Sequence, residues 1–203
     1  MERAWLPWAV PEQPDKSMSE TAVQTATYED LLRVHEHLVA EIVNGRLESH
    51  PRPAPRHALA ASSLEIELGA PFHKGRDGPG GWWILMEPEL HLGPHVLVPD
   101  LCGWRREKMP GLPETAWFDT EPDWICEILS PPTARLDRAD KMPIYAEQDV
   151  RHLWLIDVDI RTLEAYELRD GNWVLLNTFD DEKRVRAAPF DAIEFPLGVL
   201  WAS

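Results

Sequence analysis

The segment DWICEIL, residues 123–129, is the feature that most restricts the fold of this chain. It is an apolar run of strand length that ends at Pro131-Pro132, and such a run is typical of a buried β-strand. An acid, Glu127, lies inside it. A carboxylate buried without a partner is costly, so the fold must bring a positive partner to this strand. We expect Glu127 to be a functional residue, with a salt bridge to Arg135 as the structural alternative.

The pattern of apolar residues and turn signals predicts an α/β fold with a mixed central sheet. A helix is expected to begin at Thr27, an N-cap that Asp30 follows three residues later. Asn44-Gly45 predicts a β-hairpin over residues 40–49. Pro143 is expected to kink or open a helix in its region of the chain.

The remaining elements are expected as follows: helices at 56–68 and 134–149, and strands at 81–90, 95–104, 123–129, 152–157, 162–168 and 172–179. Residues 1–26 are expected to form a loose N-terminal arm, and residues 27–203 a single domain.

The composition is that of an ordinary soluble globular chain, with 44% hydrophobic and 27% charged residues. No apolar run approaches the roughly 18 residues of a membrane helix, and the start does not resemble a signal peptide. Cys102 and Cys126 are the only two cysteines, which excludes a disulfide framework. We therefore expect both as small core residues, in a chain located in a reducing cytoplasm with no membrane partner.

The net charge of −15 argues against tight, nonspecific binding to nucleic acid, because such binding depends on Lys and Arg neutralising phosphates. The charge is unevenly distributed. Residues 33–76 hold six Lys or Arg and five acids, so this stretch carries +1 and leaves −16 for the remainder. If the chain binds an anion, we expect residues 33–76 to form the binding surface.

A second acid, Asp100, follows Pro99 near the end of another apolar run. If the strands of Asp100 and Glu127 lie side by side, both carboxylates can point at one spot, where they repel unless a cation sits between them. A hard divalent cation such as Mg²⁺ suits two carboxylates. Lys141 begins the helix after the Glu127 strand. An ammonium there can orient or deprotonate a water and offset charge in a phosphoryl transition state.

Each candidate also has a plainer interpretation. Asp100 can cap a turn, and Lys141 can be an ordinary solvated lysine. Glu41 can lie on the solvent-exposed face of the hairpin, where alternation places a polar residue at every second position. His57 can contact an anion at a helix start or lie on the surface, and Arg135 can meet phosphate or face solvent. Helix capping or core packing is the role expected of three further residues: Asp137, Asp140 and Tyr145.

As a set, these residues resemble the Uma-two family of restriction-endonuclease-like proteins, within the PD-(D/E)XK nuclease superfamily. The resemblance covers roughly residues 27–200. The chain departs from it at Ala40 and Asn44, where the family commonly has an aromatic residue and Asp. The matched features are VPDL at 98–101, Glu127, Leu129, Ser130, Asp137, Lys141, Tyr145, LWLID at 153–157, the hairpin AEIVNGRL at 40–47, and His57.

The resemblance implies a restriction-endonuclease-like mixed sheet flanked by helices, with an N-terminal β-hairpin. It also implies phosphodiester cleavage with Mg²⁺, or Mn²⁺ as a substitute. Asp100 and Glu127 would hold the metal, with Glu41 nearby, and Lys141 would be the catalytic lysine. The superfamily usually places that lysine two residues after the second acid, where this chain has Leu129. The Uma-like group supplies it from the following helix, which Lys141 fits.

Three hypotheses follow for the function. The first is a Mg²⁺-dependent nuclease that hydrolyses DNA, with His57 and Arg135 as substrate contacts and a homodimer expected by analogy. The second is a catalytically inactive nuclease-fold module that binds or regulates, which the acidic charge favours. The third is hydrolysis of a phosphate ester other than nucleic acid. A basic groove beside Lys141 favours nucleic acid, and an acidic rim disfavours it.

Overall fold

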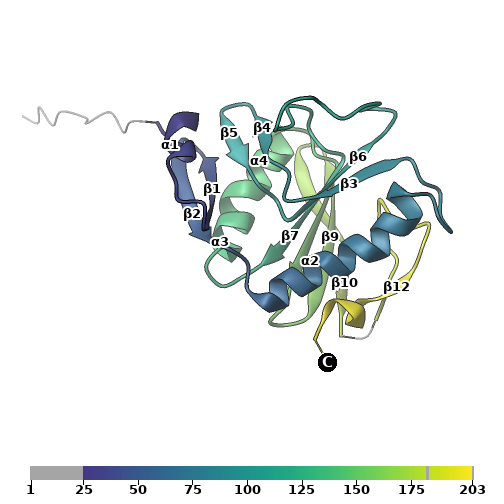
Figure 1. The fold of residues 1–203 in the computed structure, drawn as a ribbon. Coiled ribbons are helices and arrows are strands. Elements are labelled where there is room, and N and C mark those ends of the chain that lie inside the picture. The colour runs from purple at the N-terminus through teal and green to yellow at the C-terminus, as the bar shows by residue number, and fades with distance from the viewer. Residues whose placement is uncertain (1–24, 182, 203) are drawn as a thin grey trace, which may run out of the picture.

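The computed structural model describes residues 25–181 and 183–202, so most of the predicted N-terminal arm, residues 1–26, lies outside the described residues. No helix in the described part of the chain is long and apolar enough to cross a membrane. The strands are β1 (Leu38–Val43), β2 (Arg46–Pro51), β3 (Trp82–Met86), β4 (Leu90–Leu92), β5 (His95–Leu97), β6 (Leu101–Arg105), β7 (Trp124–Leu129), β8 (His152–Asp157), β9 (Thr162–Arg169), β10 (Asn172–Asp180), β11 (Arg184–Val185) and β12 (Phe195–Pro196) (Figure 1). The helical segments are α1 (Tyr28–Leu32), α2 (Pro55–Leu68), the π-helical η1 (Gly69–His73), α3 (Ala134–Leu136), the π-helical η2 (Asp137–Lys141), α4 (Met142–Glu147) and the 3₁₀ turn η3 (Leu197–Leu200).

A six-stranded sheet forms the centre of the molecule, in the order β10-β9-β8-β7-β6-β3. Strands β7 and β8 pair in parallel, and their other neighbours in the sheet pair antiparallel. The segment α3-η2-α4 connects the two parallel strands, as parallel pairing requires a crossover. All six residues of β7 are buried. The sequence prediction of an α/β fold with a mixed central sheet is confirmed.

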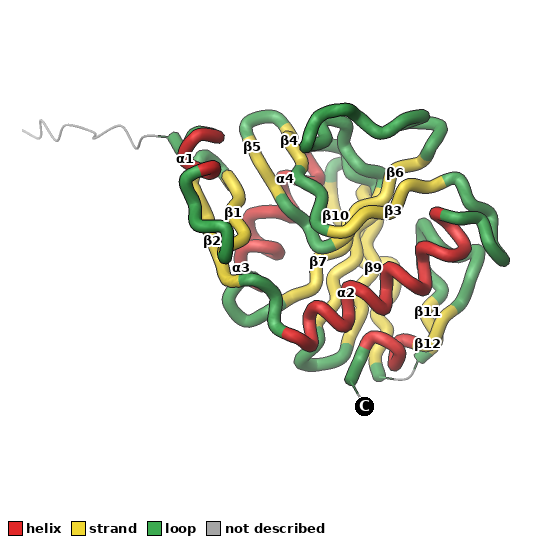
Figure 2. Tube along the Cα trace, viewed as in Figure 1, coloured by secondary structure: helices red, strands yellow, loops and turns green. Residues whose placement is uncertain are grey.

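The two faces of this sheet pack against different partners. On one face, Trp124, Cys126 and Ile128 of β7 join a core with α2 and the C-terminal segment. The intervening Ile125 and Leu129 face the other way, into a core with α4 and β4. Figure 2 shows α2 lying across the sheet, with the β1–β2 hairpin beside one end of it. By the alternation of a strand, Glu127 belongs to the second face, on the side of α4.

The hairpin formed by β1 and β2 belongs to a small sheet with the order β2-β1-β5-β4. Its turn has positive φ at both central residues, 51° at Asn44 and 73° at Gly45, as a tight two-residue hairpin requires. The prediction of a hairpin here is confirmed. Strand β1 also pairs with β5 at Ile42 and Val96, which fixes the hairpin beside the central sheet.

Four predicted elements differ from the structure. The strand expected at 81–90 ends with β3 at Met86, and Leu90 already belongs to β4 in the small sheet. The run at 95–104 is two strands in different sheets, β5 and β6, because Pro99 lacks an amide donor and interrupts the ladder. The first helix ends at Leu32, and the chain enters β1 six residues later. The helix expected at 134–149 is divided by the π-helical turn η2, and Pro143 opens the regular α4, where its missing amide hydrogen does not matter.

The first prediction concerns acid stability. His152 of β8 is buried, and burial lowers its pKa from 6.5 to about 4. Between these values the unfolded chain binds a proton that the folded chain does not, so His152 lowers the free energy of unfolding as the pH falls through this window. In urea titrations from pH 7 to pH 4, His152→Gln should therefore lose less stability than the wild type. The exposed His35→Gln is the control and should follow the wild type; an equal acid loss in both variants would contradict the prediction.

Candidate active site

Glu127 lies in β7 and is only 3% exposed. Its Oε1 atom is 2.8 Å from Lys141 Nζ and accepts a hydrogen bond of 2.5 Å from the Tyr145 hydroxyl. The alternative partner, Arg135, is wrong, because its side chain is 79% exposed and its guanidinium pairs with Asp140 at 3.6 Å. The buried acid therefore obtains its cation from the crossover that follows its own strand.

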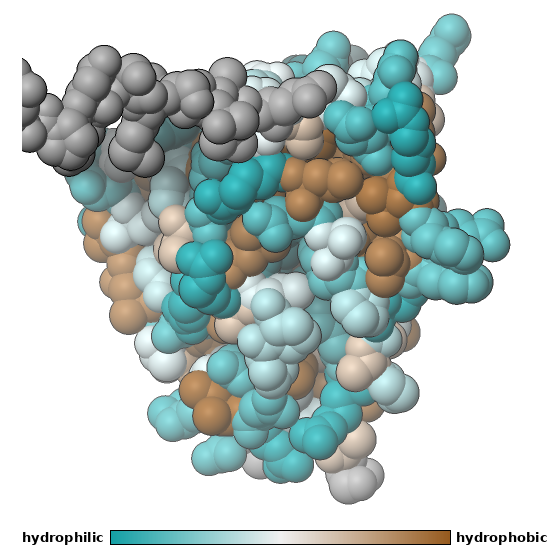
Figure 3. Space-filling model, turned by 90° about the vertical axis from the view of Figure 1, so that its left-hand side faces the viewer, coloured by the Kyte–Doolittle hydropathy of each residue, from teal (hydrophilic) through white to brown (hydrophobic). Residues whose placement is uncertain are grey.

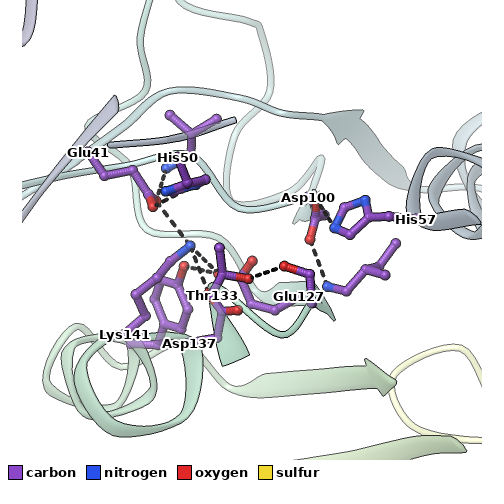
Figure 4. Close-up of polar contacts among 12 residues, drawn as sticks. Glu41, His50, His57, Asp100, Glu127, Thr133, Asp137 and Lys141 are labelled. Carbon is purple, nitrogen blue, oxygen red and sulfur yellow. Dashed lines mark hydrogen bonds and ion pairs between the residues drawn. The ribbon is translucent and has the colours of Figure 1, made fainter. Parts of the chain in front are cut away.

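Lys141 is 2% exposed and lies among three carboxylates. Its ammonium is 2.8 Å from Glu127, 3.0 Å from Glu41 and 3.5 Å from Asp137. Figure 4 shows these side chains converging from the hairpin, the central sheet and the crossover. The interpretation of Lys141 as a solvated surface lysine is wrong, and so is a capping role for Asp137, whose buried carboxylate faces Lys141 one helical turn away.

Glu41 occupies the face of β1 that turns toward the crossover, and it is buried. One carboxylate oxygen, Oε1, accepts the amide hydrogen of Val98 at 2.7 Å and also contacts Lys141. The other, Oε2, has no hydrogen-bond partner among the residues that the structure describes and lies 3.8 Å from His50 Nε2. The expected solvent-exposed face is wrong, because the crossover that carries Lys141 and the chain at Val98 cover this face of β1.

Asp100 forms a second part of the site. Extending the antiparallel register of β6 and β7 by one residue beyond Leu101–Cys126 places Asp100 opposite Glu127. Its Oδ2 accepts the amide hydrogen of Ile128 at 2.7 Å, and its Oδ1 is 3.2 Å from His57 Nε2. The predicted neighbourhood of the two acids is confirmed for β6, the strand that follows Asp100 and pairs with β7, whereas β5, which precedes Asp100, belongs to the small sheet. His57, at the start of α2, is buried rather than a surface residue, and it contacts the acid.

The charges in this cluster are not balanced. Burial raises the pKa of Glu127 to about 8 against the opposing effect of Lys141, with neighbouring acids adding to the rise. Burial also raises the pKa of Asp137. Burial disfavours the Lys141 ammonium, but the carboxylates of Glu127 and Glu41 outweigh this and raise its pKa well above the ordinary value. Lys141 is therefore charged at neutral pH, but its one ammonium does not offset the burial of the acids around it, so Glu127 holds a proton to a higher pH than an exposed glutamate does.

His57 adds a further titratable group at the edge of this cluster. Burial lowers its pKa, but the hydrogen bond and charge of Asp100 outweigh the burial, so the pKa of His57 rises above its usual value. A protonated His57 forms an ion pair with Oδ1 of Asp100, and Oδ2 of the same carboxylate still accepts the amide hydrogen of Ile128.

A cavity of about 290 Å³ opens over both parts of the site. It lies at the end of β7, where the chain leaves the sheet through Pro131 and Pro132. Arg135 is not part of its wall. The polar and charged residues that line the cavity are His50, Arg52, His57, Glu87, Asp100, Glu127, Ser130, Thr133, Asp137 and Lys141.

The chemistry of these side chains suits a hard divalent cation. Carboxylate oxygens are the ligands that Mg²⁺ prefers, and Mg²⁺ commonly takes only one or two protein carboxylates together with waters and phosphate. Asp100 and Glu127 stand opposite each other and both line the cavity. Within residues 25–181 and 183–202, no three His, Cys, Asp or Glu side chains converge closely enough to form a complete cage. The residues therefore fit a cation site with two carboxylates, Asp100 and Glu127. Glu41 does not belong to it, because its carboxylate pairs with Lys141.

Sequence reasoning missed the role of Tyr145, which was expected only to pack. Asp137, Lys141 and Tyr145 recur at intervals of four, the spacing of one helix face, so a polar face directed at Glu127 was readable in principle. The π-helical turn between Asp137 and Lys141 was not readable, because no residue in it enforces that geometry.

Comparison with known proteins agrees with this geometry. A family model described as Uma2, "Putative restriction endonuclease", matches residues 25–198. The chain belongs to the Uma2 family. A crystal structure at 1.96 Å of a putative nuclease belonging to DUF820, from Anabaena variabilis ATCC 29413, shares the fold with a TM-score of 0.70 at 21% identity, and the match covers 86% of this chain and 97% of that one. No curated protein matches the chain.

Membership in Uma2 supports a nuclease function for the chain. The likeness to the Anabaena protein shows the nuclease-like fold, a mixed sheet with flanking helices, and so confirms the predicted fold class. The expected family of the sequence analysis is also confirmed.

The second prediction tests the support of Glu127. Tyr145→Phe removes the hydroxyl that donates to Glu127 and should lower the free energy of unfolding by about 1.5–3 kcal/mol, since hydrogen bonds to charged groups have this worth. Tyr166→Phe is the matched control, because the Tyr166 hydroxyl donates to Glu164 at 2.9 Å in a half-buried setting. Urea unfolding of the two variants compares the losses, and an equal or smaller loss at Tyr145 would contradict the role assigned to it.

Proposed function

We propose that this chain is a metal-dependent nuclease that hydrolyses DNA phosphodiester bonds, with Mg²⁺ as the working cation and Mn²⁺ as a substitute. The observation that carries the proposal is the contact of Lys141 with Glu127 at 2.8 Å, at the base of a cavity where Asp100 stands opposite Glu127. A structural ion pair alone has no need of a second carboxylate, Asp100, opening on the same cavity.

Asp100 and Glu127 are the residues proposed to hold the cation. When bound, such an ion supplies Lewis-acid polarisation of a phosphoryl oxygen and makes a bound water more acidic. The backbone amide of Ile128 and the ring of His57 hold the Asp100 carboxylate in place. The Tyr145 hydroxyl does the same for Glu127. Glu41 is proposed as an auxiliary carboxylate that acts through Lys141.

Lys141 is proposed to orient the attacking water and to offset charge on phosphorus. Its raised pKa keeps it protonated at neutral pH, so it donates hydrogen bonds and does not act as a general base. Three carboxylates limit its motion, and such preorganisation is the main source of electrostatic stabilisation in enzyme sites. The water oxygen would attack phosphorus in line with the leaving oxygen, and the bond from phosphorus to that oxygen would break. The proton that the attacking water loses would pass to solvent, and the leaving oxygen would take one up from solvent.

The substrate contacts are proposed separately. His57 lines the cavity with a raised pKa, so it can meet a phosphate oxygen as well as Asp100. Arg135 lies outside the cavity wall, so a phosphate contact there requires substrate that extends beyond the cavity. A homodimer, with two sites for two strands, stays a prediction.

One observation favours the second candidate, an inactive binding module. The ammonium of Lys141 already contacts both Glu41 and Glu127. This pairing compensates part of the buried negative charge without a metal ion. Binding of Mn²⁺ separates the two candidates, because only the nuclease needs the metal.

The third prediction is the cleavage test. Wild type, Glu127→Gln and Lys141→Met are incubated with plasmid and single-stranded DNA in Mg²⁺, Mn²⁺ or EDTA. Both variants should lose at least about 100-fold in rate, because removing one group that stabilises transition-state charge has that effect. Glu164→Gln is the control, a half-buried acid on β9 paired with Arg138 at 2.9 Å, and it should cleave like the wild type.

Three outcomes would decide between the candidates. Loss of cleavage in EDTA and in both site variants, with the control active, supports the nuclease. Cleavage that survives Glu127→Gln or Lys141→Met contradicts the assigned site. A folded wild type that neither cuts DNA nor binds Mn²⁺ by calorimetry leaves the binding module.

A further inference from the structure

The site cavity adjoins a second hollow of about 360 Å³ on the outer side of the hairpin. The two hollows share part of their walls, namely Val39, Arg52, Glu87 and Val98. The second hollow continues over α1 and the start of β1, where its wall has an apolar part, formed by Leu31, Leu32, Val34 and Leu38. Its acids are Glu36, Glu87 and Glu89, and Arg52 is its one Lys or Arg among the described residues. Figure 3 shows this side of the molecule, where hydrophobic residues lie exposed among hydrophilic ones. A chain-like ligand can therefore lie across both hollows.

The depth of the reactive groups restricts the form of such a ligand. Lys141 and Glu127 are almost fully buried, and both line the wall of the 290 Å³ cavity. A duplex holds its phosphates on a stiff cylinder, so a buried site of this kind is reached more readily by a flexible strand. An unpaired strand is flexible and can enter, as single strands do in protein channels lined by positive and apolar groups.

Arg52 lies at the junction of the two hollows, directly after β2. Its side chain is 58% exposed, and its guanidinium is 3.6 Å from the Glu87 carboxylate. An exposed pair at this distance contributes little to stability, so a phosphate can displace Glu87 at small cost. A guanidinium is the side-chain group best suited to phosphate. Arg52 also belongs to the stretch 33–76, which carries +1 in a chain of net charge −15.

We propose that an unpaired DNA strand binds across the two hollows, with the scissile phosphate in the site cavity and a neighbouring phosphate on Arg52. The adjacent base lies against the apolar wall of the second hollow, formed by residues such as Leu31 and Leu38. This inference rests on the proposed nuclease function and names its substrate form. It also accounts for how an acidic protein binds DNA, since few phosphates need to be neutralised.

The fourth prediction measures binding and cleavage separately. Fluorescence anisotropy in EDTA, which prevents hydrolysis, compares a labelled 12-nucleotide thymidine strand with a duplex of equal length. The wild type should bind the single strand at least about tenfold more tightly. Arg52→Gln should weaken single-strand binding roughly three- to tenfold and reduce the salt slope by about 0.7, the value for one phosphate contact. Glu87→Gln should strengthen binding, because it releases Arg52 and removes a repelling charge.

Arg151→Gln is the matched control. Arg151 is 71% exposed, pairs with Glu167 at the same 3.6 Å, and lines neither hollow. It should leave single-strand affinity unchanged. Equal binding of duplex and single strand, or an Arg52→Gln effect no larger than that of Arg151→Gln, overturns the inference.

Cleavage by the same proteins in Mg²⁺ keeps the two claims apart. An active wild type that cuts duplex and single strand at equal rates overturns the inference and leaves the nuclease standing. A wild type that cuts neither, although it binds the single strand through Arg52, overturns the nuclease function instead.

Discussion

The Lys141 ammonium is the point at which three separate parts of the chain meet. It contacts Glu41 from the hairpin, Glu127 from the central strand, and Asp137 from its own helical segment. Each of these carboxylates is buried, so each would be costly without the shared cation. This one interaction ties the small sheet, the central sheet and the crossover together at the cavity, beside an apolar core that the two sheets share.

The site has two unlike parts, one around Lys141 and one around Asp100. Around Lys141 the groups are held by ion pairs and by the Tyr145 hydroxyl. Around Asp100 they are held by a backbone amide and by His57. The cavity opens over both parts, so its wall combines a fixed ammonium, Lys141, with the two acids Asp100 and Glu127. This combination is the one on which the proposed phosphodiester hydrolysis rests.

Much of the arrangement was readable from the sequence because local chemistry dictates it. Asn44-Gly45 permits positive φ and fixes the hairpin, and Thr27 with Asp30 forms the expected capping box. The apolar run around Glu127 predicted a buried strand that needs a cation. The sequence analysis expected Mg²⁺ or Arg135 in that place, and the structure has Lys141 there. The spacing of the two acids allowed their strands to pair but did not require it.

The remainder depends on tertiary packing, which local patterns do not contain. Alternation in a hairpin predicts two faces, but only the crossover that carries Lys141 and the chain at Val98 decide that Glu41 is covered. The break at Pro99 was visible as a residue, yet its effect, sending β5 and β6 to different sheets, depends on the partners of each strand. The second hollow is likewise a product of packing between α1, β1 and the β3–β4 turn.

The most direct test of the central claim is a double-mutant cycle between Glu127 and Lys141, measured by urea unfolding of the wild type, Glu127→Gln, Lys141→Met and the double variant. If the buried pair organises the site, each single change is strongly destabilising, and the double variant is more stable than the sum of the two losses predicts, with a coupling of about 2–3 kcal/mol. Losses that add within about 0.5 kcal/mol would show that the two residues do not depend on each other, and would contradict the account.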